Sequence, residues 1–570
     1  KIFITIILLN IFAVGFSQNF TFKYRVSFKD KNNSIYSISN PSAFLTNKAI
    51  ARRTNQGISI NELDIPVNSW YIDSLINKGA SIINQSRWFN SVIISMTDTS
   101  ALQQIRGFSF VKDVEQVIAF NKKKKDKSET NNSSTKSNND IFKPFISGER
   151  IVENKNDISY STNSAKNLDY GFAFYQIDML QGIALHNQGF MGQGMTIAVL
   201  DAGFWQVNTI SAFDSLWNNG QILGTRDFVQ PGNNVFNEST HGMMVLSTMG
   251  ANLPGQIVGT APKASYWLIR TEDANSENII EEDNWVAGAE FADSIGADII
   301  NSSLGYTVFD APFMNHSYND MNGKTARASL GAAIAARKGI IVVNSAGNSG
   351  STPWQYIGAP ADADSILAVG AVDINGNYAV FSSVGPSYDK RVKPDVAALG
   401  QNAVVANASG PLMGSGTSFA SPILCGMVAC LWQAFPSKNN QEIIDAVKRS
   451  SSQYYNPDSL LGYGIPNFPI AAILLSGNNI PNFDTENLFT VFPNPYDNDL
   501  YIAYNSVDTQ RVTLEMYELT GKKILSISEI PRYTGYNSIT LNNLSELKSG
   551  IYIIRLTSGA KTSIKKVIKK

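Results

Sequence analysis

The sequence contains few cysteines and few histidines. Of its 570 residues, only 2 are cysteine and 3 are histidine. So few cysteines cannot support a disulfide-built scaffold. Cys425 and Cys430 are five positions apart in a segment that we expect to be helical, so their side chains point about 140° apart and cannot bridge. We expect both to be buried packing residues. The search for a catalytic imidazole is equally short.

Charged residues are also scarce, at 16%, and the net charge is −1. This composition excludes a strongly acidic or basic disordered chain and gives no electrostatic reason to expect a nucleic-acid partner. The neutrality is a cancellation, because residues 1–169 carry an excess of basic side chains while residues 170–475 carry an excess of acidic ones. The length predicts about three to four domains, each able to bury a core.

Long hydrophobic runs are limited to two segments. Ile2–Phe16 is almost entirely apolar, follows the basic Lys1 and is followed by Ser17, which is typical of a secretory signal peptide over residues 1–17. The alternative, a membrane anchor, needs about 20 apolar residues. Ser418–Phe435 has no charge, but its Ser, Gly, Ala and Pro content favours a helix buried in a large core over a membrane span.

Residues 18–120 have the pattern of a small α+β domain. Expected strands are Phe20–Phe28 and Ser91–Met96, and expected helices are Ser42–Gln56 and Asn68–Lys78. The linker expected over residues 121–168 begins with a polar, low-complexity run, Asn121–Asp140, that contains Lys122–Lys125. Such a segment cannot bury apolar area. We expect a flexible linker that contains the maturation cleavage site.

Residues 169–475 alternate short apolar runs with helical segments. The runs are Met195–Leu200, Ala264–Ile269, Ala297–Asn301, Gly339–Asn344 and Ile366–Val372, and helices are expected at Asn284–Ser294 and Thr325–Lys338. This alternation predicts an α/β domain with a doubly wound parallel sheet, in which functional residues follow the carboxyl ends of the strands. Residues 486–570 instead alternate with period two, which predicts a β-sandwich.

Four residues within 169–475 are candidates for catalysis. Asp201 directly follows the first apolar run, where a buried carboxylate needs a partner; a turn or helix-capping role is the alternative. His241 stands in Thr240-His241-Gly242 before an apolar segment, whereas we expect structural or surface roles for His186 and His316. Ser418 follows Gly416 at the start of the long apolar helix, whose free N–H groups favour a developing oxyanion.

Asn348, after the run Gly339–Asn344, provides a further amide donor. The chain order Asp, His, Ser, with an Asn donor, is that of subtilisin. Residues 170–475 therefore resemble subtilisin-like (S8 family) serine proteases. The segments that carry the resemblance are Ala198–Gly203, Thr240–Gly242, Ser303–Gly305, Ser345–Asn348 and Gly416–Pro422.

The resemblance implies a secreted serine endopeptidase that needs no cofactor for catalysis and acts on proteins or peptides. Ser418 would be the nucleophile, His241 the general base and acid, and Asp201 the residue that orients the imidazole. The Asn348 amide and the Ser418 backbone N–H would bind the oxyanion. Ser303, Leu304 and Gly305 would form an edge strand that pairs with substrate, and Gly347 would also contact it.

The sequence departs from the family pattern in two places. The histidine motif continues Met243-Met244, so a second histidine of many subtilisins is missing. The loop Asn252–Ile257 is short where relatives often wrap a structural calcium. No metal ligand is therefore expected, and a calcium ion is possible but unsupported.

The flanking regions resemble two further families. Residues 20–120, closing with Phe110–Glu115, resemble the inhibitory prosegments of such proteases. Residues 487–570 resemble the C-terminal sorting domain of the Bacteroidetes type IX secretion system, through Val491–Pro495, Tyr517–Gly521, Ser549–Tyr552 and the basic end Lys565–Lys570. The implied partners are the chain's own prosegment and the type IX machinery, with delivery through the periplasm to the surface or the medium. The alternative for the tail is a carbohydrate- or protein-binding module.

Two rival functions remain at this point. A sedolisin-type protease would use Glu and Asp instead of His241, and an inactive surface-binding protein would keep only the scaffold. The acidic residues between Glu272 and Asp283 also have two possible interpretations. It either stabilises a helix N-terminus on a solvated face, or it lines the acyl-side substrate cleft and favours basic side chains.

Overall fold

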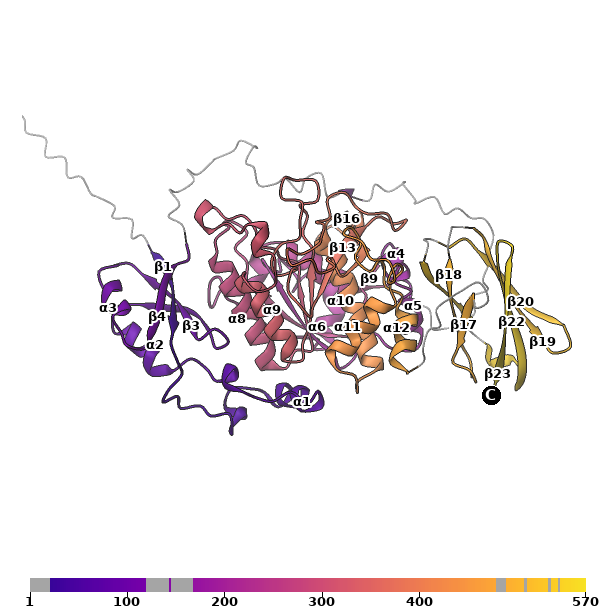
Figure 1. The fold of residues 1–570 in the computed structure, drawn as a ribbon, viewed down its shortest axis with the longest axis horizontal. Coiled ribbons are helices and arrows are strands. Elements are labelled where there is room, and N and C mark those ends of the chain that lie inside the picture. Colours follow the sequence, from indigo (N-terminus) through magenta and orange to yellow (C-terminus); the bar gives the residue numbers. More distant parts are fainter. Residues whose placement is uncertain are drawn as a thin grey trace, which may run out of the picture.

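The computed structural model describes residues 21–118, 143–144, 168–477, 488–506, 510–531, 535–541 and 544–570. The expected signal peptide (1–17) and nearly all of the expected linker lie outside the described residues. Figure 1 shows three parts in a row, with the N-terminal part at one end, the largest part in the middle and the C-terminal part at the other end. We refer to them as the N-terminal (21–118), central (168–477) and C-terminal (488–570) parts.

The N-terminal part is a four-stranded antiparallel sheet in the order β2-β3-β1-β4. Its elements are β1 (Phe22–Phe28), α1 (Asn47–Asn55), α2 (Ser69–Ile76), β2 (Ser81–Ser86), β3 (Ser91–Met96), α3 (Leu102–Arg106) and β4 (Val111–Gln116). Side chains alternate along β3 because successive residues face opposite sides of a sheet. Val92 and Ile94 join the core beneath α2 and α3, whereas Ile93 packs against Ile280 of the central part.

The central part is built on a seven-stranded parallel sheet in the order β14-β13-β12-β11-β6-β10-β7. Its strands are β6 (Thr196–Asp201), β7 (Ile222–Asp227), β10 (Ser265–Arg270), β11 (Ile299–Ser302), β12 (Ile341–Ser345), β13 (Leu367–Val372) and β14 (Val396–Leu399). Strand β6 is in the interior of the sheet. The doubly wound fold class expected from the sequence is confirmed.

Helices cover both faces of this sheet. The helices are α4 (Phe174–Asp178), α5 (Ile183–Asn187), α6 (Asp214–Asn218), α7 (His241–Gly250), α8 (Ile280–Ile295), α9 (Arg327–Arg337), α10 (Thr417–Ala434), α11 (Asn440–Arg449) and α12 (Phe468–Leu475). Along β6, Ile197 and Val199 belong to the core that holds α7 and α10, while Ala198 and Leu200 belong to the core that holds α8 and α9. A strand buried on both faces needs the unbroken apolar run seen in the sequence.

Short strands complete the central part. These are β8 (Asn252–Leu253) and β9 (Ile257–Val258), which pair as a hairpin, and β15 (Ala403–Val405) and β16 (Leu412–Gly414), the second of which pairs with β5 (Lys143–Pro144). The segment that we expected to be a short loop, Asn252–Ile257, therefore comprises β8, the turn of the hairpin and the first residue of β9.

The C-terminal part consists of two antiparallel sheets, β17-β18-β21 and β20-β19-β22-β23, around one hydrophobic core. Its strands are β17 (Phe489–Phe492), β18 (Leu500–Ser506), β19 (Val512–Glu518), β20 (Lys523–Glu529), β21 (Gly535–Leu541), β22 (Gly550–Ser558) and β23 (Lys561–Lys569). The β-sandwich expected from the period-two pattern is confirmed. The Asn467 amide donates a hydrogen bond of 3.0 Å to Ser538 Oγ, which joins this part to the central one.

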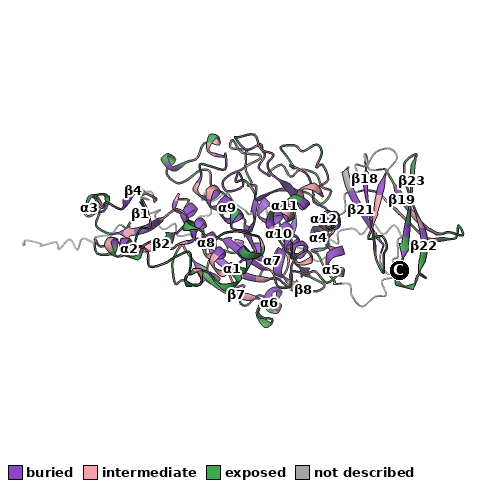
Figure 2. Cartoon of the chain, turned by 60° about the horizontal axis from the view of Figure 1, so that its bottom comes forward, coloured by how far each residue is buried: buried purple, intermediate pink, exposed green. Residues whose placement is uncertain are grey.

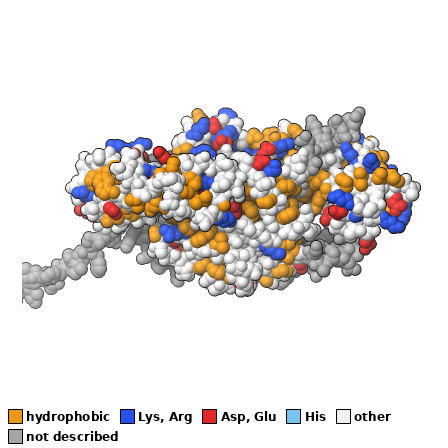
Figure 3. All heavy atoms as spheres, turned by 90° about the horizontal axis from the view of Figure 1, so that it is seen from below, with side chains coloured by type: hydrophobic (Ala, Val, Ile, Leu, Met, Phe, Trp, Pro, Cys, Tyr) orange, Lys and Arg blue, Asp and Glu red, His pale blue; other side chains and the backbone are white. Residues whose placement is uncertain are grey.

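Burial explains the unusual composition. Figure 2 shows the helices around the central sheet as mostly buried. Helix α10 is long and apolar enough to cross a membrane, yet 83% of it is buried inside the protein. Cys425 and Cys430, both on α10, are free and buried, as expected. On the face in Figure 3, charged side chains are scattered among uncharged surface, in keeping with the low charge content.

Candidate active site

Asp201 is the last residue of β6, at the carboxyl end of an interior strand. Its side chain is fully buried. The Oδ1 atom accepts hydrogen bonds from the Ala202 N–H and from His241 Nδ1, both at 2.7 Å. A buried carboxylate of this kind is stable only with such donors, so the strand end fixes the orientation of the imidazole.

His241 begins helix α7, and 27% of its side chain is exposed. The approach to Asp201 depends on Gly242, where a Cβ would lie 2.3 Å from the Gly203 carbonyl oxygen and 2.9 Å from Asp201 Cβ. Burial of the imidazole disfavours its charged form, but the charge and hydrogen bond of Asp201 outweigh this, so the pKa of His241 is raised above its ordinary value. The carboxylate of Glu272 acts in the same direction.

Ser418 is the second residue of helix α10, which contains Pro422. Proline has no N–H, so the carbonyl of Ser418, four residues earlier, loses its normal helical partner. The Ser303 hydroxyl replaces that partner by donating a hydrogen bond of 2.9 Å to the Ser418 carbonyl. This contact ties the first turn of α10 to the segment after β11.

The Ser418 hydroxyl donates to the Ser303 carbonyl at 3.5 Å, the long end of the hydrogen-bond range, rather than to His241. The rings of His241 and Phe419 have centroids 6.4 Å apart, so the N-termini of α7 and α10 face each other across a short gap. Catalytic hydrogen bonds are often long in proteins without substrate and shorten when substrate binds.

Asn348 lies against the same helix N-terminus. Its Oδ1 atom accepts hydrogen bonds from the Thr417 N–H and the Thr417 hydroxyl, both at 2.9 Å. A Cβ at Gly416 would lie 3.5 Å from Asn348 Nδ2 and 3.7 Å from the Ser418 N. The two N–H donors therefore border one small space, which the absence of a side chain at Gly416 leaves open.

The segment Ser303–Gly305 follows β11 but is not part of any strand, whereas the sequence led us to expect an edge strand. The next residue, Tyr306, pairs with Ala359 through N–H to carbonyl contacts of 2.8 and 3.3 Å. A Cβ at Gly305 would meet only the Ala359 carbonyl oxygen, at 3.9 Å. In the described part of the chain no strand lies beside this segment, so it has no strand partner.

The remaining predicted residues fall around this centre. The Gly347 N–H donates to Thr417 Oγ1 at 3.2 Å, and the Leu304 carbonyl accepts from the Asn344 amide at 3.2 Å. These hydrogen bonds therefore join six of the eight site residues expected from sequence to one another or to the first turn of α10. The two exceptions are Leu304, which is bonded to Asn344, and Gly305.

The other two histidines lie outside this centre. His186 is buried between Tyr170 OH and the Thr260 carbonyl, each at 2.9 Å, and burial lowers its pKa to about 4. His316 is paired with the buried carboxylate of Glu282. Both have structural partners.

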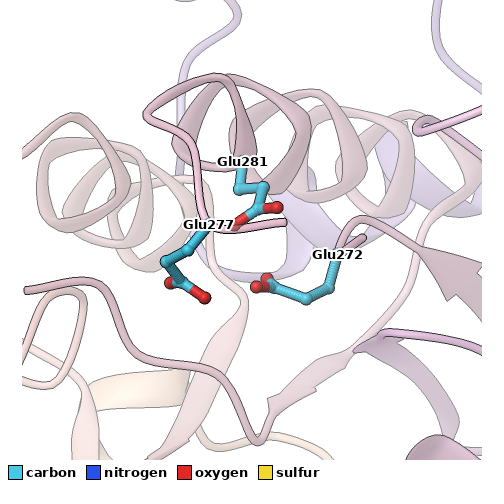
Figure 4. Close-up of side chains that lie close together, drawn as sticks. All are labelled: Glu272, Glu277 and Glu281. Carbon is cyan, nitrogen blue, oxygen red and sulfur yellow. The ribbon is translucent and has the colours of Figure 1, made fainter. Parts of the chain in front are cut away.

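Sequence reasoning did not resolve the acidic run. Helix α8 starts at Ile280 rather than near Asn284, which places Glu281, Glu282 and Asp283 in its first turn, where they are 0–3% exposed. The interpretation of these acids as a solvated face is therefore wrong. Figure 4 shows Glu281 converging with Glu272 and Glu277. Their carboxylate oxygens lie within 4.8 Å of one another, a spacing that could hold a cation.

Three family models match successive parts of the chain. The subtilase family model matches residues 192–464. The model of the peptidase S8 propeptide domain of Bacteroidota matches residues 23–135. The model of the secretion system C-terminal sorting domain matches residues 490–570.

Individual proteins similar to this chain include two subtilisins and one solved protease domain. Subtilisin NAT of Bacillus subtilis subsp. natto is 30% identical over 304 residues, which is 52% of this chain and 71% of the relative. Subtilisin DY of Bacillus licheniformis is 30% identical over 313 residues, 54% of this chain and 100% of the relative. The self-cleaved protease domain of PatA matches at a TM-score of 0.41 and 24% identity, covering 50% of this chain and 98% of that one. The chain belongs to the subtilase family and is a serine-type endopeptidase made with a propeptide and exported through a type IX sorting domain.

Proposed function

We propose that this protease hydrolyses peptide bonds through an acyl-enzyme formed on Ser418, with His241 and Asp201 completing a catalytic triad. The observation that carries the proposal is the 2.7 Å hydrogen bond between His241 Nδ1 and buried Asp201, across a short gap from the first turn of α10. The hydrogen bond leaves Nε2 of the imidazole to act on the serine hydroxyl.

The reaction has two steps, acylation of Ser418 and hydrolysis of the acyl-enzyme. Ser418 Oγ attacks the scissile carbonyl while His241 takes its proton, and the C–N bond then breaks as His241 returns that proton to the leaving amine. Water repeats the sequence on the acyl-enzyme, releasing the acid and regenerating Ser418. Asp201 stays ionised throughout and stabilises the imidazolium.

The tetrahedral oxyanion needs donors that are already in position. The space bordered by Asn348 Nδ2 and the Ser418 N–H supports such a role, and the bonds from Thr417 to Asn348 Oδ1 hold the amide in the required orientation. Removing one donor of this type costs about 2.7–4 kcal/mol of transition-state stabilisation.

The substrate backbone would pair with Ser303, Leu304 and Gly305, adding the strand that this segment lacks, with Gly347 on the other wall of the cleft. Substrates are then proteins or peptides bound in extended form. No cofactor takes part in these steps. A structural calcium ion is common in the family, and no step depends on it.

The described N-terminal part packs on helix α8, and we propose that it inhibits the enzyme intramolecularly until cleavage. The boundaries proposed are 18–120 for the prosegment, 121–168 for the linker, 169–475 for the catalytic domain and 486–570 for the sorting domain, with 1–17 as the signal peptide. The sorting domain would engage the type IX machinery.

The experiment compares secreted wild-type protein with Ser418→Ala on a fluorogenic casein substrate. We expect no cleavage by Ser418→Ala while its circular dichroism stays unchanged. The matched control is Ser415→Ala, a neighbouring serine whose hydroxyl accepts a hydrogen bond from the Asn402 N–H; it should retain activity. Full activity in Ser418→Ala would refute the assignment.

A further inference from the structure

The glutamate cluster lies beside the catalytic strand end. Strand β10 pairs with β6 so that Arg270 lies opposite Asp201, and the Thr271 N–H donates to the Asp201 carbonyl at 3.0 Å. Glu272 therefore leaves the sheet at the same edge as Asp201. From the other side of β6, the Tyr306 hydroxyl donates to Glu272 Oε2 at 3.0 Å. The cluster thus lies between the His241 dyad and the segment that ends at Gly305.

Among the described residues, Glu281 has no positive partner. Glu281 is 1% exposed, and neither of its oxygens has a hydrogen-bond donor within the described residues. It points toward Glu272 and Glu277, which are half-buried and so reachable from the surface (Figure 4). Arg270, on the strand that leads to Glu272, is engaged by Asp227 and Glu238 at 3.0 and 3.1 Å. Ionising a buried carboxylate in this state is costly unless a cation joins it.

The electrostatics of the cluster agree with this requirement. Burial, with the charge of Asp201 adding to it, raises the pKa of Glu272 to about 7, although hydrogen bonds with Glu281 and with the Tyr306 hydroxyl oppose the rise. Burial and the charges of Glu272 and Glu277 raise the pKa of Glu281 far above its usual range. A positive group that entered the cluster would allow all three carboxylates to ionise.

We propose that Glu272, Glu277 and Glu281 form a subsite for a lysine or arginine side chain of the peptide substrate, on the acyl side of the scissile bond. The inference rests on the proposed function, because it needs the substrate backbone to lie along Ser303–Gly305. A side chain from that backbone enters the space between His241 and Tyr306, where Glu272 is held. A peptide brings its own cation, so the subsite is completed only when substrate binds.

A basic segment of the chain, Lys122–Lys125, is close enough in sequence to Ile118 to reach the glutamate cluster. The Val117 carbonyl accepts a hydrogen bond of 3.2 Å from the Ile280 N–H, one residue before Glu281. Ile118 packs in the same small cluster as Ile280. The run Lys122–Lys125 begins four residues after Ile118, a distance that an extended chain covers in at most about 14 Å. The maturation region of the same polypeptide therefore has the charge that the subsite would select.

The test uses mature enzyme and matched fluorogenic peptides that differ only in lysine or norleucine at one position on the acyl side. We expect kcat/KM to be at least about tenfold higher for lysine at one of these positions. Glu281→Gln should bring this lysine-to-norleucine ratio close to one. Glu442→Gln, the same change on the surface of α11, should leave the ratio as in wild type. Should Glu281→Gln fail to fold, half-buried Glu277→Gln is expected to lower the ratio in the same direction.

A second arm separates this inference from the proposed function. Binding of the same two peptides to Ser418→Ala, measured by fluorescence anisotropy, should favour lysine whether or not the enzyme turns over. Equal binding and equal kcat/KM for the two peptides would overturn the subsite while leaving catalysis intact. Calcium that stabilises chelator-treated wild type but not Glu281→Gln, without any lysine preference, would identify a metal site and also overturn it. Absence of cleavage by the matured wild-type enzyme, together with lysine selectivity in binding, would count against the catalytic assignment alone.

Discussion

Asp293→Asn should release the prosegment from its catalytic domain. Asp293, on α8, is fully buried and accepts hydrogen bonds from Arg52, Arg53 and Arg87, all of which belong to the N-terminal part. An amide at this position keeps the shape but removes the only charge shared by three guanidinium groups. The mature enzyme lacks the N-terminal part and therefore these contacts, so the substitution should weaken only the binding of the prosegment.

The expected loss of binding free energy depends on which partners each arginine keeps after the substitution. Breaking a buried ion pair by removing one partner costs about 3–5 kcal/mol. Arg53 still has Asp64 at 2.9 Å, and Arg52 still has the carbonyl of Ala297 at 2.6 Å. We therefore expect the lower end, about 3 kcal/mol, which weakens inhibition by the prosegment roughly 150-fold.

The assay is inhibition of mature enzyme by the prosegment added in trans, for wild type and Asp293→Asn. The control is the exposed pair Lys48–Asp298, in which 42% of the lysine side chain is accessible; Lys48→Gln should cost less than about 1 kcal/mol. The opposite net charges of residues 1–169 and 170–475 predict inhibition that weakens with added salt. Because the Asp293 network is buried, it is screened weakly, and only the Lys48 contribution should fall with salt. An unchanged inhibition constant in Asp293→Asn would refute this reasoning.

Three further predictions concern the catalytic centre. Asp201→Asn should lower kcat by about 10⁴-fold and move the acidic limb of the kcat/KM profile to lower pH, because the raised pKa of His241 depends on that carboxylate and activity is lost as pH falls through it; an unmoved limb in stopped-flow pH profiles would contradict the pairing. Ser303→Ala should destabilise the fold by about 1–3 kcal/mol in urea titrations, because it leaves the Ser418 carbonyl beside Pro422 without a donor; wild-type stability would argue against that contact. Gly416→Ala should lower kcat more than it changes KM, since its methyl would enter the space between Asn348 Nδ2 and the Ser418 N–H; an unaltered kcat would mean that the oxyanion lies elsewhere.

Much of the fold could be predicted because its signals are local. Strand β3 matches its expected range, Ser91–Met96, and β6 differs from the expected run by one residue at each end. Apolar runs mark strands buried on both faces, and period-two alternation marks the sandwich. Asp201 and His241 could be paired in advance because a strand-end carboxylate needs a donor.

The remaining features depend on contacts between distant segments. Nothing in the order of residues shows that Ser303 compensates for Pro422, since the two are joined only when β11 and α10 meet. The start of α8 was misplaced because Glu281 and Glu282 have the composition of a solvated turn, whereas tertiary packing buries both. The same packing creates the glutamate cluster, so a sequence could indicate acids near the cleft but not which of them converge.

The most direct test of the account is covalent labelling of the matured, secreted protein with a fluorophosphonate probe, followed by mass spectrometry of the labelled peptide. A serine activated by His241 and Asp201 should be labelled at Ser418 alone, and both Ser418→Ala and His241→Ala should lose the label. A matured, folded protein that leaves Ser418 unlabelled, or carries the label at another serine, would contradict the proposed triad.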